Sequence, residues 1–251
     1  MIYGIIPARF ASTRLPGKPL AKIAGRPMIQ WVYESAKHSK LVNDLIVATD
    51  DRRVFDAVEE FGGNVVMTPD NIKTGSDRIA FVAKELSDCT IVVNIQGDEP
   101  FIPGMMIDQA IEPFLFDQRV YMSTLIKRIT KTEELESAST VKVVFDGDNY
   151  ALYFSRAPIP FVRDNLNTDL LLEKGIYFKH IGLYVYRKEY LLKFTGLQSS
   201  YLEDLEKLEQ LRVLENGYKI KCVETTLDSI SVDTPMDLAE ANIFARNLNK
   251  N

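Results

Sequence analysis

The chain of 251 residues carries 30 Lys and Arg against 35 Asp and Glu, which gives a formal net charge of −5. Hydrophobic residues make up 46% of the chain and charged residues 26%, as in ordinary folded proteins, so the composition argues against a disordered chain. The acidic balance also argues against a general nucleic-acid binder, because surfaces that bind polyanions are basic. It does not exclude a small cationic pocket. The length allows one large α/β domain or two small ones.

Cysteine and histidine are too scarce for several kinds of site. Two cysteines, Cys89 and Cys222, and two histidines cannot build a disulfide framework or a Cys-rich zinc site, and both thiols are expected to be buried and reduced. The first residues lack the basic region of a signal peptide. No apolar stretch approaches the roughly 20 residues of a membrane span. We therefore expect a cytoplasmic protein with no membrane partner.

The first third of the chain alternates short apolar runs with amphipathic segments. Strands are predicted over 2–6, 44–48, 64–67 and 90–95, and helical patterns cover 28–36, 54–58 and 79–86. Both faces of these strands look apolar, as in parallel strands covered by helices. The pattern predicts right-handed crossovers and an α/β fold with a doubly wound, mostly parallel, Rossmann-like sheet.

The middle of the chain is richer in β-strand patterns. Strands are predicted over 120–125, 141–145, 151–154 and 176–186, with a turn at 146–149 and a polar loop at 163–175. Leucines from 202 to 214 keep near-helical spacing, and Gly217 is the expected stop of that helix. A closing helix follows Asp233-Thr234-Pro235. We expect one domain over 1–251, with a β-rich insertion at about 120–200.

The loop after the first strand concentrates positive charge. Arg9, Arg14 and Lys18 lie within ten residues of each other in an otherwise acidic chain. Open α/β sheets bind ligands at the carboxyl ends of their strands, and two guanidinium groups with an ammonium suit a triphosphate. The loop is neither a Walker loop nor a Gly-x-Gly-x-x-Gly motif, so ATPases and dehydrogenases are disfavoured.

Two aspartates are candidate magnesium ligands. Asp98 follows an apolar strand and Gly97, a residue that permits an unusual backbone angle or a close ligand approach. Mg²⁺ binds proteins through one or two carboxylates together with phosphate oxygens of the substrate. Asp233 is either a second ligand or merely a helix N-cap, and the two roles are compatible if Thr234 provides the cap.

Further polar residues give weaker signals. Thr74, Ser76 and Arg78 could contact a base or phosphate before a helix, although capping alone explains Ser76 or Asp77. Five further polar residues in the second half of the chain are weak evidence for a binding site by themselves. A structural histidine in the core and a solvated helix face would explain them equally well. The five are Arg156, His180, Tyr184, Glu209 and Gln210.

These motifs together resemble the 3-deoxy-manno-octulosonate (Kdo) cytidylyltransferases, also called CMP-Kdo synthetases. The similarity runs nearly end to end. Its main blocks are 6–20, 47–50, 75–78, 94–100, 151–157, 180–184, 202–217 and 232–235. The segment 163–175 does not match the family tightly. The resemblance implies a fold of the nucleotide-diphospho-sugar transferase type, in which the β-rich insertion contributes to the sugar pocket and to a dimer interface.

The resemblance also implies a reaction and its residues. CTP and Kdo, an acidic eight-carbon sugar, would give CMP-Kdo and pyrophosphate for lipopolysaccharide synthesis. Lys18, Arg14 and Asp98 would be catalytic, and Asp98 and Asp233 would hold Mg²⁺ although they stand 135 residues apart. The nucleotide would contact Pro7, Ala8, Arg9, Arg14, Lys18, Thr74, Ser76, Arg78 and Gln96. The sugar would contact Arg156, His180, Tyr184, Glu209 and Gln210.

Two alternatives to Kdo activation stay open in the sequence. One is the same reaction on the 8-amino analogue of Kdo, and the other is a catalytically silent nucleotide-binding domain. The resemblance further implies a homodimer. Its interface is expected among aromatic residues of the β-rich middle, and the alternative is that these residues belong to the hydrophobic core. They are Phe154, Phe161, Tyr177 and Phe178.

Overall fold

The computed structural model describes residues 1–11, 14–163 and 167–248, and the chain divides into two compact units. Unit 1 comprises Met1–Asp108, Arg187–Thr195 and Asp228–Asn251, and unit 2 comprises Gln109–Tyr186 and Gly196–Leu227. The strands of the predicted β-rich middle belong to unit 2. This division does not test the prediction of a single domain, because one domain can contain two compact units.

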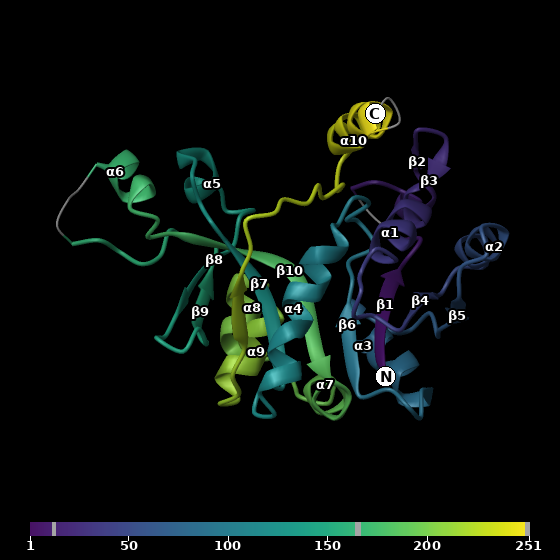
Figure 1. The fold of residues 1–251 in the computed structure, drawn as a ribbon, viewed down its shortest axis with the longest axis horizontal. Coiled ribbons are helices and arrows are strands. Elements are labelled where there is room, and N and C mark those ends of the chain that lie inside the picture. Colours follow the sequence, from purple (N-terminus) through teal and green to yellow (C-terminus); the bar gives the residue numbers. More distant parts are fainter. Residues whose placement is uncertain (12–13, 164–166, 249–251) are drawn as a thin grey trace. The chain divides into compact units, whose positions relative to one another are not determined.

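Unit 1 is built on parallel strands, as the sequence predicted. They are β1 (Ile2–Ala8), β4 (Asp44–Thr49), β5 (Val65–Met67) and β6 (Ile91–Asn94), in the order β6-β1-β4-β5 (Figure 1). Most residues of β1, β4 and β6 are buried. At the end of this row, however, Val66 and Met67 are exposed, so the expectation of two covered faces is wrong for β5.

The helices of unit 1 include the three predicted from its first third. They are α1 (Met28–Ala36), α2 (Arg52–Glu60), α3 (Gly75–Glu85), α7 (Lys188–Thr195) and α10 (Pro235–Leu248). A short hairpin of β2 (Lys22–Ile23) and β3 (Arg26–Pro27) follows the 3₁₀ turn η1 (Lys18–Leu20). One core cluster joins this hairpin region to Trp31 of α1 and to Ala241 and Ala245 of α10. Helix α4 (Gly104–Phe116) crosses the boundary between the two units.

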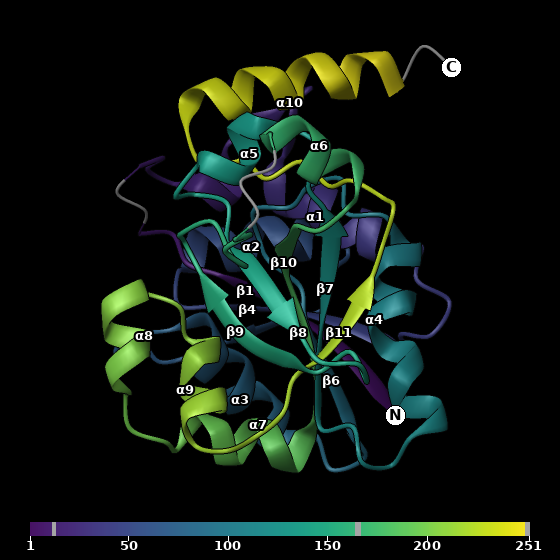
Figure 2. The same ribbon diagram turned by 90° about the vertical axis from the view of Figure 1, so that its left-hand side faces the viewer.

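Unit 2 has a mixed arrangement of strands. They are β7 (Met122–Arg128), β8 (Lys142–Phe145), β9 (Ala151–Ser155), β10 (Phe178–Arg187) and β11 (Lys221–Glu224). Neighbouring strands pair antiparallel in the order β9-β8-β10-β7, and β11 runs parallel to β7 (Figure 2). Four of these strands were predicted from the sequence, and β11 was not.

The aromatic residues expected at a dimer interface are mostly interior in unit 2. Phe154 is fully buried, and Tyr177 and Phe178 are only 6% and 8% exposed. Phe161 is 90% exposed, the one member of the four at the surface. The expectation that this aromatic set forms an interaction surface is therefore wrong for three residues, because their rings are buried within unit 2.

The helices of unit 2 differ from the sequence prediction at two places. They are α5 (Thr132–Glu136), α6 (Thr168–Glu173), α8 (Tyr201–Glu206) and α9 (Gln210–Glu215). Helix α6 lies in the predicted polar loop and buries Leu171 and Leu172. The single helix expected over 202–214 is two helices, because Lys207 adopts a left-handed backbone conformation with φ of 55° between them.

The stop predicted at Gly217 is confirmed. Its φ is 76°, its N–H donates to the carbonyl of Leu214 at 2.9 Å, and Tyr218 N–H donates to Val213 at 3.1 Å. These two bonds form the Schellman end of a helix.

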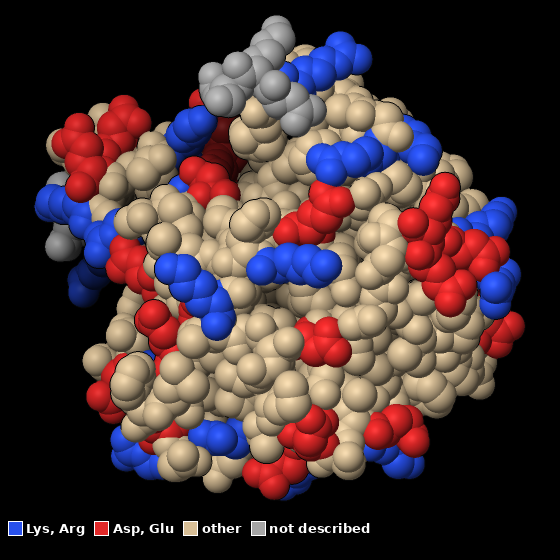
Figure 3. Space-filling view, turned by 45° about the vertical axis from the view of Figure 1, so that its right-hand side comes forward, with Lys and Arg blue, Asp and Glu red and all other residues tan. Residues whose placement is uncertain are grey.

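Both cysteines are buried free thiols, as predicted. Among the described residues, no helix has the length and apolar character that a membrane crossing requires. Acidic and basic side chains alternate with uncharged surface over the face drawn in Figure 3.

Candidate active site

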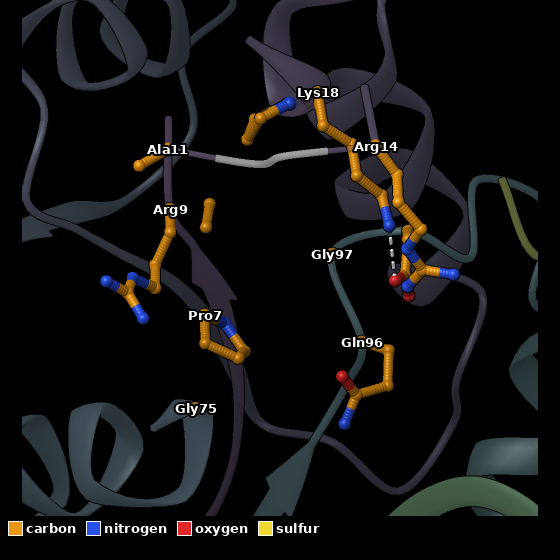
Figure 4. A pocket seen from close by; sticks show the side chains of 11 residues that line it. Pro7, Arg9, Ala11, Arg14, Lys18, Gly75, Gln96 and Gly97 are labelled. Carbon is orange, nitrogen blue, oxygen red and sulfur yellow. Dashed lines mark hydrogen bonds and ion pairs between the residues drawn. The ribbon is translucent and has the colours of Figure 1, made fainter. Parts of the chain in front are cut away.

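A cavity of about 360 Å³ lies in unit 1 at the carboxyl ends of β1 and β6. Seven residues predicted to bind the nucleotide or the metal line it. They are Pro7, Ala8, Arg9, Arg14, Lys18, Gln96 and Asp98. Its other lining residues are Ala11, Pro19, Gly75 and Gly97. In Figure 4, Arg9 lies on one side of Pro7, whereas Lys18, Arg14 and Gln96 lie on the other side.

The close approach of two strand ends shapes the floor of this cavity. Strands β1 and β6 are parallel neighbours, so the loops that follow them start at the same edge. A Cβ atom on Gly97 would lie 2.8 Å from the carbonyl oxygen of Pro7. Glycine is therefore required here by the backbone of Pro7 itself, and its φ is not in the left-handed region.

Lys18 lies between the two predicted metal ligands. Its Nζ is 2.6 Å from Asp98 Oδ2 and 2.8 Å from Asp233 Oδ1, and its side chain is only 14% exposed. The η1 turn holds the lysine, with Leu20 N–H donating to the carbonyl of Gly17, whose φ is 66°. The backbone conformation at Gly17 and Lys18 therefore places the ammonium group in contact with the carboxylates of Asp98 and Asp233.

A backbone hydrogen bond brings the two aspartates together. Val232 N–H donates to the carbonyl of Asp98 at 2.9 Å, so the segment before α10 runs beside the end of β6. Because both carboxylates contact one ammonium nitrogen, they are able to share a cation. The fold therefore brings together two aspartates that stand 135 residues apart in the sequence.

The capping role that the sequence left open for Asp233 belongs to its neighbour Thr234. Thr234 Oγ1 accepts from the N–H of Asp237 at 3.2 Å, and the carboxylate of Asp237 accepts from the N–H of Thr234 at 2.8 Å. This reciprocal pair is a capping box. The carboxylate of Asp233 is thereby left for Lys18 and for Arg14, whose Nη2 is 2.9 Å away.

The donor set suits Mg²⁺ better than a closed metal centre. Among the described residues, no group of three or more His, Cys, Asp or Glu side chains could hold an ion. Asp98 lines the cavity, and Asp233, which does not line it, contacts the lining residues Lys18 and Arg14. Two such carboxylates fit an ion that takes its other ligands from water and substrate phosphate. A bound ion would replace the Lys18 ammonium as their counter-ion.

Glu99 adds a buried carboxyl beside this pair. Burial raises its pKa to about 7, with a smaller upward contribution from the charges of Asp98 and Asp233, while Ser229 and Lys18 act in the opposite direction. Its Oε2 is buried and has no hydrogen-bond partner in the described part of the chain.

Three residues predicted to bind the nucleotide do not line the cavity. Thr74 is the N-cap of α3 and accepts from Asp77 N–H at 3.1 Å, so neither Ser76 nor Asp77 provides that cap. Ser76 is itself buried, and Gly75 between them lines the cavity. The side chain of Arg78 is fully buried, so the direct nucleotide contact predicted for it is not available in this structure.

The predicted sugar residues all belong to unit 2, and two of them are in contact. The rings of His180 and Tyr184 have centroids 5.2 Å apart, on either side of an irregularity in β10. His180 Nε2 is 3.0 Å from the hydroxyl of Thr124. Burial lowers the pKa of His180 to about 3, so its ring is neutral near pH 7. Burial also raises the pKa of Tyr184 well above its usual value.

The remaining three lie around the junction of α8 and α9. Arg156 donates to the backbone carbonyls of Glu206, Lys207 and Ala138, which occupies much of its guanidinium group. Glu209 stands at the start of α9 and its charge acts on Tyr184, while Gln210 is buried. The sugar-binding roles of this set stay predictions.

Sequence reasoning missed Asp50 as a site residue. It lies 3.9 Å from Arg9 and 2.7 Å from Arg78, directly after β4. A signal was present, since Asp50 directly follows β4, and open α/β sheets bind ligands at the carboxyl ends of their strands. Nothing local indicates which arginine such a carboxylate would bind.

Comparisons with known proteins identify the family of this chain. Residues 3–220 match the family model described as cytidylyltransferase. A 3-deoxy-manno-octulosonate cytidylyltransferase of Geotalea daltonii is 54% identical over 242 residues, covering 94% of this chain and 95% of the relative. One of Chloroherpeton thalassium is 49% identical over 247 residues, covering 97% and 98%.

Solved structures extend the similarity to three dimensions. A CMP:2-keto-3-deoxy-manno-octonic acid synthetase complexed with CTP matches with a TM-score of 0.90 and 39% identity, covering 98% of this chain and 99% of that one. A 4-diphosphocytidyl-2C-methyl-D-erythritol synthase of Anaerococcus prevotii matches with a TM-score of 0.62 and 16% identity over 98% and 96%, which shows the shared α/β fold alone. From the matched residues and these relatives, the chain belongs to the 3-deoxy-manno-octulosonate cytidylyltransferase family.

Proposed function

We propose that this enzyme transfers the cytidylyl group of CTP to Kdo, giving CMP-Kdo and pyrophosphate. The observation that carries the proposal is the cavity of unit 1, whose lining includes Lys18, Arg14 and Asp98. Lys18 contacts the carboxylates of Asp98 and Asp233, and Arg14 contacts that of Asp233. Relatives about 50% identical over nearly the whole chain carry the name of this activity. A catalytically silent domain is disfavoured, because both Lys18 and Asp98 are present in the cavity.

The chemistry asks for positioning and for charge neutralisation. The 2-hydroxyl of Kdo forms a bond to the α-phosphorus of CTP, the bond from that phosphorus to the bridging oxygen breaks, and the hydroxyl proton leaves to solvent. Pyrophosphate departs with the electron pair of the broken bond. No covalent enzyme intermediate is needed, so the protein acts through cations and hydrogen bonds placed around the phosphates.

The cavity residues have distinct roles in this proposal. Lys18 neutralises charge near the α-phosphate, and Arg14, whose side chain is 66% exposed, reaches the departing phosphates. Arg9 binds the triphosphate on the other side of Pro7, where its Nη1 donates to the carbonyl of Lys73 at 2.7 Å. Gln96 supplies an amide that can hydrogen-bond the base.

We include Mg²⁺ as the cofactor, held by Asp98 and Asp233. The bound ion would offset phosphate charge and lower the pKa of the attacking hydroxyl. Support comes from the two carboxylates that contact the Lys18 ammonium and from the preference of Mg²⁺ for few protein ligands.

Pyrophosphate release tests the activity directly. With CTP, Kdo and MgCl₂ the purified chain should release pyrophosphate, and omission of any one of them should abolish the signal. Replacing CTP by UTP at the same concentration is the matched control for base recognition. Absence of pyrophosphate release with all three present would contradict the proposal.

The acceptor is Kdo in preference to its 8-amino analogue. The relatives described above carry the Kdo name, so the 8-amino alternative is not favoured. Turnover of the two sugars at equal concentration compares them directly, and a higher kcat/KM for the 8-amino sugar would reverse the assignment.

The cellular setting follows from the same proposal. We place the enzyme in the cytoplasm, where CTP is available, with its product serving lipopolysaccharide synthesis. We also propose a homodimer, on the basis of the family resemblance. The exposed Phe161 is the aromatic residue of unit 2 on which to test it. A monomeric mass in solution at micromolar concentration would contradict the dimer.

A further inference from the structure

A fully buried arginine stands behind the nucleotide cavity. The side chain of Arg78, on α3, has no exposed surface. Its guanidinium group donates to Asp50 Oδ2 at 2.7 Å, to the hydroxyl of Thr68, and to the carbonyl of Ile72 at 3.4 Å. These partners follow β4, follow β5 and precede α3, so one side chain joins three segments of unit 1.

The same carboxylate oxygen also faces Arg9. Asp50 Oδ2 is 3.9 Å from Arg9 Nε, compared with 2.7 Å from Arg78. Arg9 lines the cavity and its side chain is 41% exposed, whereas that of Asp50 is 14% exposed. Asp50 therefore stands between a buried arginine, which it binds closely, and a cavity arginine, which it contacts weakly.

Charge balance explains why this order of distances matters. A mostly buried carboxylate needs a counter-ion, since an unpaired buried charge is costly. Arg78 satisfies that need, so Arg9 is left to interact with ligands in the cavity. Without the Arg78 charge, Arg9 would be the nearest cation, and its guanidinium group would be drawn onto Asp50 and away from the cavity.

We propose that Arg78 is a positioning residue of the nucleotide site, which neutralises Asp50 and thereby keeps Arg9 available to the phosphates of CTP. The inference rests on the proposed function, because it takes CTP as the ligand of the cavity. It replaces the direct contact that the sequence suggested for Arg78 with an effect transmitted through Asp50.

CTP affinity measured by calorimetry, without turnover, tests the proposal. R78M should weaken CTP binding at least about tenfold, a loss of about 1.4 kcal/mol. Adding D50N to R78M should restore affinity to within about threefold of the wild type, because the unbalanced carboxylate is gone. In the R9A background, R78M should have little further effect on affinity.

The D50N background keeps the test decisive if R78M alone does not fold. There, R78M should change CTP affinity by less than about threefold. A loss of tenfold or more in that background would overturn the proposal, since Arg78 would then act independently of the Asp50 charge. Unchanged CTP binding in folded R78M, or failure of D50N to restore it, would overturn it as well.

A matched control separates positioning from stability. Arg212 of unit 2 forms a similar buried pair, with Nε 2.7 Å from Glu203. R212M should lower the midpoint of thermal unfolding and leave CTP affinity unchanged. If the wild type itself does not bind CTP, the proposed function fails. If it binds and the Arg78 variants behave otherwise than expected, only this inference fails.

Discussion

Replacement of Lys18 by methionine isolates the ammonium group from the volume of its side chain. In the structure Nζ lies 2.6 Å and 2.8 Å from the two carboxylates, and the side chain is mostly buried. K18M keeps an unbranched chain in the same space and removes the charge and its hydrogen bonds. The prediction is a large loss of kcat in a protein that still folds.

The expected size of the loss follows from these contacts. Hydrogen bonds to charged groups contribute about 1.5–3 kcal/mol each. If Lys18 exchanges one carboxylate contact for a phosphate contact that strengthens in the transition state, its removal raises the barrier by that amount. The corresponding fall in kcat is about 10- to 150-fold. Folding stability should also decrease, because the carboxylates of Asp98 and Asp233 lose the cation between them.

Pyrophosphate release at saturating CTP, Kdo and MgCl₂ gives kcat, and urea unfolding monitors the fold. K22M is a matched control, because Lys22 is an exposed lysine on the nearby β2 strand. It should keep kcat within about twofold of the wild type. If folded K18M retains more than about a third of wild-type kcat, the electrostatic role assigned to Lys18 is refuted.

Three further predictions concern stability and shape. Because burial holds the pKa of His180 at about 3, the unfolded chain takes up its proton first as the pH falls below 6.5. The free energy of unfolding should therefore fall as the pH drops from 6.5 towards 3, and the His180 contribution to this fall is about 2 kcal/mol at pH 5. In urea unfolding, H180Q should lack this contribution. G97A places a Cβ 2.8 Å from the oxygen of Pro7, so it should raise the KM for CTP and lower stability by about 1–3 kcal/mol. T234A removes the α10 cap that binds Asp237 N–H and should cost about 1 kcal/mol in unfolding.

The first two of these have contrary outcomes of their own, and a further variant, D233N, concerns the active site. If the stability of H180Q falls with pH as steeply as that of the wild type, the argument from the burial of His180 is refuted. G147A is the control for G97A, because a Cβ at Gly147 meets no atom within 4 Å, and it should hardly change stability. If G97A also leaves stability and the KM for CTP unchanged, the steric argument for Gly97 is refuted. D233N should lower kcat far more than it lowers stability; the reverse would make Asp233 a structural residue.

Local sequence signals predicted the elements that depend on neighbouring residues. Apolar runs gave β1, β4 and β6, because their side chains are buried on both faces and leave a pattern readable within a few residues. The same reasoning failed where a single backbone angle decides. The left-handed Lys207 ends α8, and no turn residue such as glycine marks that position in the sequence.

The candidate site divides in the same way. The sequence determined its chemical inventory, namely cations after the first strand and carboxylates at two other positions, since these follow from residue type and strand ends. The tertiary structure alone decided their partners. A backbone bond from Val232 to Asp98 brings Asp98 close to Asp233, which stands 135 residues away in the sequence. Asp50 binds Arg78 more closely than Arg9. Such pairings depend on chain topology and on which charge is buried, and neither property is encoded in a short stretch of sequence.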